Sequence, residues 1–173
     1  MYELSARLTS QMCDMLRNYK NVKWLIVGCT DHPYISEHHK DMVDAGDVIF
    51  INYEDDLPGL YTICDIFLNP DRVGGGYSVA WAVQQGLAVA SPSGGDAEIC
   101  ILGKDYCLPG EADLVPFIES LINDSELLGR KKEEYRQLTN QWDFEGYVGQ
   151  LIAGINQLAD EFEKTRKVEC SYE

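Results

Sequence analysis

The chain has 173 residues, of which 45% are hydrophobic and 25% charged, as in an ordinary folded domain. Its formal net charge of −15 disfavours non-specific binding to nucleic-acid phosphates or to an anionic membrane. No apolar run approaches the ~18 residues of a membrane span, and no signal peptide opens the chain. Its six cysteines are scattered and form no Cys-x-x-Cys, so we expect reduced thiols in a cytoplasmic protein.

Short apolar runs alternate with segments of helical periodicity along the chain. The apolar runs are continuous, which is typical of strands that are buried on both faces of a sheet. They predict strands over residues 22–28, 47–52, 65–70, 87–92 and 105–110. The periodic segments predict helices over residues 7–20, 34–46, 57–65, 77–86, 94–103, 112–124, 125–141 and 143–167.

This alternation indicates βαβ units and a parallel sheet. We expect a three-layer, Rossmann-like α/β domain with about six strands, over residues 1–163. Residues 164–173 are polar, and we expect them to fray. The first helix begins near Leu8 after only "MYELSA", a stub of a strand at most, so we expect a fragment whose N-terminal part was left out.

Three consecutive glycines, Gly74, Gly75 and Gly76, follow the run "DIFLNP" and precede a predicted helix. Ligands of open α/β sheets bind beyond the carboxyl ends of the strands, where a helix N-terminus offers unpaired N–H groups. Glycines let a phosphate approach this backbone, and Ser78 adds a hydroxyl. The pattern predicts a diphosphate site, with a tight turn as the structural alternative. Neither a P-loop nor a dinucleotide fingerprint is present.

The order of these segments resembles the C-terminal, nucleotide-sugar-binding domain of GT-B glycosyltransferases of the group 1 type. The likeness is carried by "VKWLIVG", "VIFINYEDDLPGLYTICDIFLNP", "GGGYSVAWAVQQGLAVASPSGGDAEI" and "QWDFEGYV". It implies one half of a GT-B architecture, with a nucleotide diphosphate sugar as donor and neither cofactor nor metal. It also implies that the acceptor domain is the missing N-terminal part, so that this half alone is inactive.

The resemblance also assigns candidate site residues. The glycine loop would hold the diphosphate, Tyr53 would face the base and Arg7 would assist the phosphates. Trp81 either stacks on a ribose or base or simply fills the pocket, and Asp96 either caps the next helix or lines the sugar site. The substrate-binding candidates are Arg7, Tyr53, Gly74, Gly75, Gly76, Tyr77, Ser78, Trp81 and Asp96.

Several positions depart from the family pattern. Val73 and Trp81 stand where the family has two glutamates, and Met12 and Cys13 stand where it has a lysine and a glycine. A site without these polar partners loses discrimination. The alternative hypothesis is therefore a degenerate binding module without transferase activity; an unrelated flavodoxin-like regulatory domain is a third. The sequence leaves the sugar, the base, the acceptor, the stereochemistry and the oligomeric state open.

Two further groups are interpreted as structural. The segment "HPYISEHHKD" contains three histidines, but His38 and His39 are adjacent and point apart on a helix, so we expect a solvated face rather than a metal site. Asp65 begins a predicted strand, and we expect it to be structural rather than catalytic.

Overall fold

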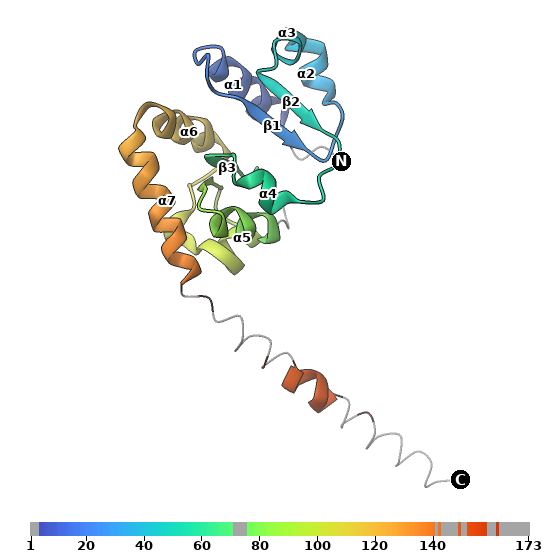
Figure 1. Cartoon of the computed structure of the whole chain (residues 1–173), viewed down its shortest axis with the longest axis vertical. Helices are drawn as coiled ribbons and strands as arrows, with labels where there is room; N and C mark the ends of the chain where they lie inside the picture. The colour runs from blue at the N-terminus through green and yellow to red at the C-terminus, as the bar shows by residue number, and fades with distance from the viewer. Residues whose placement is uncertain are drawn as a thin grey trace, which may run out of the picture. The chain divides into compact units, whose positions relative to one another are not determined.

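The computed structural model describes residues 4–70, 76–140, 142, 149, 152–158 and 162 of the chain (Figure 1). The chain divides into two compact units, Met1–Thr139 and Asn140–Glu173. In the second unit, residues 152–158 are helical and exposed. The predicted tail, residues 164–173, lies outside the described residues, and the extent of the domain stays a prediction.

The first part of unit Met1–Thr139 contains one long helix, two short helices and two strands. Ser5 caps the long helix, because its Oγ accepts a hydrogen bond from the Leu8 N–H at 3.0 Å. The predicted helix over residues 34–46 is two helices, since the backbone leaves the helical conformation at His39. The elements are α1 (Ala6–Leu16), β1 (Trp24–Val27), α2 (Pro33–His38), α3 (Lys40–Asp44) and β2 (Val48–Ile51).

The second part of this unit contains two strands and a larger number of helical segments. The segment predicted as a helix over residues 94–103 forms a π-helix, η1, and two 3-10 turns follow it. The elements are α4 (Leu57–Tyr61), β3 (Ile66–Leu68), α5 (Gly76–Gln84), β4 (Ala88–Ala90), η1 (Ala97–Leu102), η2 (Lys104–Tyr106), η3 (Glu111–Asp113), α6 (Leu114–Asn123) and α7 (Ser125–Thr139).

The predicted three-layer, Rossmann-like fold with a sheet of about six strands, as in one half of a GT-B architecture, is wrong. The described residues form two separate two-stranded parallel sheets, in which β1 pairs with β2 and β3 pairs with β4. The strand predicted over residues 105–110 contributes only an isolated bridge between Pro92 and Leu108. Leu4 and Ser5 are not in a strand. No strand of the described residues lies between β1 and β3, so the two ladders form separate sheets and the fold is mixed α/β with a divided sheet.

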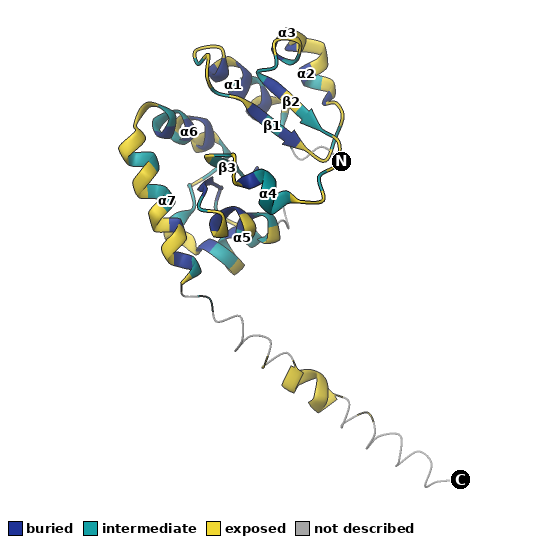
Figure 2. Ribbon diagram, in the orientation of Figure 1, coloured by how far each residue is buried: buried dark blue, intermediate teal, exposed yellow. Residues whose placement is uncertain are grey.

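Buried side chains connect the helices to the strands (Figure 2). The main hydrophobic cluster takes Leu8, Met12 and Cys13 from α1, Trp24 and Ile26 from β1, and further residues from β2, β4 and α6. Helix α1 also packs against α6, and α7 packs against α5 and β4. Helix α5 is thus packed against α7 and against β4, the strand that pairs with β3.

Candidate functional site

The candidate site is centred on the N-terminus of α5. This nine-residue helix begins at Gly76, and its first turn contains no acidic residue. Val79, Ala82 and Val83 bury one face of α5, while Tyr77 is 82% exposed on the other. Gly74 and Gly75 lie outside the described residues. The helix therefore presents its unpaired N–H groups and positive dipole end next to the glycine loop.

The carboxyl end of β3 is fixed just before this loop. The Asn69 N–H donates to the Ala90 carbonyl at 2.9 Å, and Asn69 Nδ2 donates to Ser91 Oγ at 2.9 Å. Both Asn69 and Ser91 are buried. The two hydrogen bonds hold the chain in one position where it leaves the sheet, which limits where the glycine loop can start.

The second glycine-rich turn lies against the start of α5. A Cβ placed on Gly76 would lie 3.8 Å from the Asp96 Cβ and 3.7 Å from Ile101 Cγ1, which are ordinary van der Waals contacts. Asp96 occupies the N-cap position of η1, but its side chain makes no capping hydrogen bond. The predicted capping role of Asp96 is therefore not realised as a hydrogen bond. Asp96 lies close to Gly76, and its role in lining the donor-sugar site stays a prediction.

An acidic side chain already uses part of this second turn. Glu98 Oε2 accepts a hydrogen bond from the Gly94 N–H at 2.7 Å. A carboxylate at this position competes with any phosphate for that amide. The signal for this bond in the sequence is the spacing Gly94-x-x-x-Glu98, which the predicted site did not include.

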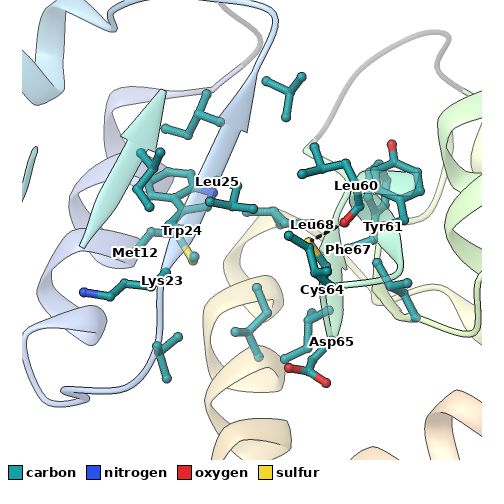
Figure 3. Close-up of a pocket in the computed structure, with 18 of the residues that line it drawn as sticks. Met12, Lys23, Trp24, Leu25, Leu60, Tyr61, Cys64, Asp65, Phe67 and Leu68 are labelled. Carbon is teal, nitrogen blue, oxygen red and sulfur yellow. Dashed lines mark hydrogen bonds between the residues drawn. The ribbon is translucent and has the colours of Figure 1, made fainter. Parts of the chain in front are cut away.

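A cavity of about 1340 Å³ lies between the two sheets, and we call it the inter-sheet cavity (Figure 3). Trp24 and Leu25 lie on one side of it, and Phe67 and Leu68 lie on the other. All residues of β1 and β3 line it, together with Gly28 and Pro70 beyond the ends of those strands. Tyr53, which is 77% exposed, and Ser78 of α5 line the same cavity.

The structure thus brings some predicted residues together and leaves others apart. Tyr53 and Ser78 share the inter-sheet cavity, and Gly76 and Asp96 are neighbours. Arg7 is exposed in the first turn of α1 and is not among the residues that line the cavity. Trp81, 38% exposed, and Tyr77 belong to α5 but do not line the cavity either.

Two of the residues that depart from the family pattern, Met12 and Cys13, are buried. Met12 is 4% exposed and Cys13 is fully buried, so both belong to the hydrophobic core. Burial raises the pKa of the Cys13 thiol to about 11, which keeps it protonated and unreactive. Burial also raises the pKa of Cys29, Cys64 and Cys107. None of these four thiols is activated as a nucleophile.

The histidines do not form the solvated face that the sequence suggested. His32 is 5% and His39 is 7% exposed, whereas His38 is exposed. Among the residues that the structure describes, no three His, Cys, Asp or Glu side chains are grouped so that they could hold a metal ion. Asp65 forms an exposed ion pair with Lys132 at 2.6 Å, and its structural rather than catalytic role stays a prediction.

A comparison with protein-family models finds no match, and a comparison with curated proteins finds none either. Within the described part of the chain, the helices are too short or too polar for any of them to cross a membrane.

Proposed function

We propose that this chain binds the diphosphate of a nucleotide sugar at the N-terminus of α5, as the donor-binding part of a glycosyltransferase. The observation that carries the proposal is the start of α5 at Gly76, directly after the glycine pair, with no acidic residue in the first turn. A helix of this length offers free N–H groups to an anion, and glycine permits close approach of the phosphate.

The groups around α5 suit the rest of such a ligand. The side chains of Tyr77 and Trp81 are exposed on α5 and offer aromatic faces to a base or a sugar. Tyr53 and Ser78 both line the inter-sheet cavity. A ligand that contacts both residues therefore extends from the end of β2 to the first turn of α5. In this proposal the acceptor and the catalytic base come from outside the chain, and the nucleotide sugar is its small-molecule partner.

A second candidate function is a binding module that has no transferase activity. The buried positions of Met12 and Cys13 favour it, because two positions that are polar or open in the family belong to the core here. The carboxylate of Glu98, bonded to the Gly94 N–H, also occupies an amide that a phosphate would use. This candidate predicts weak nucleotide binding or none.

Calorimetric titration of the whole chain with UDP, GDP and ADP, each with and without Mg²⁺, tests the proposal. Gly76→Ala is the matched control for Gly76→Asp, because a Cβ at this position makes only ordinary contacts. We expect saturable binding of one nucleotide, little change in Gly76→Ala, and a loss of about tenfold or more in Gly76→Asp, since a carboxylate repels the phosphates. Absence of binding by the folded chain would reject the proposal in favour of the binding module.

A further inference from the structure

The inter-sheet cavity is bounded by two strand edges that have no neighbouring strand among the described residues. The Trp24 N–H of β1 donates to the carbonyl of Asp47, the residue just before β2. The Gly28 N–H, just beyond β1, donates to the carbonyl of Ile51 at the end of β2. Backbone groups of alternate residues in a strand point to opposite edges. The N–H and C=O groups of Leu25 and Val27 therefore point away from β2, toward the cavity that both residues line.

The same argument holds for β3. The Ala88 N–H of β4 donates to the Asp65 carbonyl just before β3 at 3.1 Å. The Asn69 N–H just after β3 donates to the Ala90 carbonyl of β4 at 2.9 Å. The backbone groups of Ile66 and Leu68 consequently face the other edge, and both residues line the inter-sheet cavity. In the described residues each sheet has only two strands, so neither edge has a strand partner there.

Two open edges around one cavity specify the chemistry of an occupant. Unpaired backbone N–H and C=O groups beside apolar surface cost free energy, and an extended backbone is the partner that satisfies a whole row of them. A small molecule would fill only part of this space, because the cavity of about 1340 Å³ exceeds the ~300–1,000 Å³ of usual ligand pockets.

The lining determines which side chains such a backbone would carry. Most of the lining is apolar, including Leu25, Val27 and Leu68. Two of its charged groups are already paired, because Lys23 binds Asp47 at 2.8 Å and Asp65 binds Lys132 at 2.6 Å. The centre of the occupant is therefore apolar. Its flanks are basic, since the chain has a net charge of −15 and attracts cations.

We propose that the inter-sheet cavity binds an extended, apolar segment of another polypeptide chain, which adds as a β-strand to the free edges of β1 and β3. Addition of a strand to an open edge is a common mode of peptide recognition, in which backbone hydrogen bonds supply affinity and side-chain pockets supply specificity. It would continue the pairing already present in β1–β2 and β3–β4. The proposal does not depend on nucleotide binding at α5.

Amide hydrogen exchange followed by NMR on the full chain tests this directly. The probe is a peptide of about five valine and isoleucine residues, the length of a typical short strand, with two lysines at each end. We expect saturating peptide to slow exchange of the Leu25, Val27, Ile66 and Leu68 amides by about tenfold or more. The Trp24 amide, already bonded to Asp47, serves as the internal reference.

Two controls distinguish strand addition from binding through charge or apolar contacts alone. A peptide of the same sequence with alternate backbone nitrogens methylated keeps the charges and side chains but loses hydrogen bonds. Val27→Pro removes an N–H of the free edge, and Val27→Ala shortens the side chain while keeping that N–H. We expect weaker binding for the methylated peptide and for Val27→Pro, and near-normal binding for Val27→Ala.

The proposal is overturned if no edge amide is protected in the folded chain, or if the methylated peptide binds equally well. A third variant carries the same strand sequence fused ahead of Met1, which raises its effective concentration. Protection by the fused strand alone, with none by free peptide, would assign the cavity to a strand of the same chain and would likewise reject a partner strand.

Discussion

Asn69 and Ser91 form a buried side-chain hydrogen bond of 2.9 Å, although they are 22 positions apart in the sequence. The bond joins the residue that follows β3 to the residue that follows β4, beside the start of the glycine loop. It therefore ties the position of the candidate site to the pairing of these two strands.

Replacing Ser91 by alanine is expected to lower the free energy of unfolding by about 1–3 kcal/mol, because Asn69 Nδ2 loses this acceptor in a buried environment. Urea unfolding at neutral pH measures the change. Ser93→Ala is the matched control, since Ser93 is only half-buried, and its effect should stay within about 0.5 kcal/mol. Equal stability of Ser91→Ala and the wild type would contradict the role assigned to the bond.

Tyr135 anchors α7 to β4, and its contribution should depend on pH. Its hydroxyl donates to the Val89 carbonyl at 2.8 Å, and the residue is 2% exposed. Burial raises the pKa of Tyr135 above its usual value of 10.0. The stability that Tyr135 contributes is thus complete below that value and is lost as the pH rises above it.

We expect Tyr135→Phe to unfold about 1 kcal/mol more easily than the wild type at pH 7. The difference should narrow above pH ~10, because only the wild type must keep this buried phenol protonated. Unfolding curves at both pH values measure this, with Tyr77→Phe, which alters an exposed hydroxyl, as the control. A difference that stays constant with pH would argue against the burial of an un-ionised Tyr135.

The cysteines should differ sharply in reactivity. Cys100 is exposed, whereas Cys13 is fully buried with a pKa of about 11. Because the thiolate is the reactive form, iodoacetamide at pH ~8 should modify Cys100 first and Cys13 only after unfolding. Mass spectrometry of the digested protein locates the label. Early modification of Cys13 in the folded chain would show that α1 does not bury it.

Replacement of His39 by leucine should stabilise the protein. The side chain is buried, and neither ring nitrogen of His39 has a hydrogen-bond partner among the described residues. An apolar residue of similar size removes these unsatisfied atoms, so we expect the free energy of unfolding to rise by about 1 kcal/mol. His38→Leu, at an exposed position, should change it little. A drop in stability for His39→Leu would indicate that the imidazole has a partner in solution.

Local features of this chain could be predicted from its sequence. The spacing of Leu8, Met12 and Met15 placed α1, and all three residues are buried. The helices predicted over residues 34–46 and 77–86 end close to their last residues, because Gly46 and Gly86 follow α3 and α5 with φ values of 71° and 77°, which other residues rarely adopt. The four strands also lie inside the predicted apolar runs. Each of these features depends on neighbours within a few positions.

The candidate site could be predicted only in part. The start of α5 after the glycines follows from local sequence, and Tyr53 and Ser78 do share a cavity. The burial of His39 and the hydrogen bond from Gly94 to Glu98 were not predicted. His39 was assigned to the solvated face of one continuous helix, whereas the helix breaks at His39 between α2 and α3, and His39 is buried.

The sequence by itself located the four strands and the longer helices α1, α5, α6 and α7, because hydrophobic periodicity and glycine stops act over a few residues. The tertiary structure alone decided how the strands pair. The residue pattern of an apolar run is the same whether or not another strand pairs with it. Strand pairing depends on hydrogen bonds between segments that are distant in the sequence. That is why the apolar runs predicted one continuous sheet, while the described residues form β1–β2 and β3–β4 with two open edges between them.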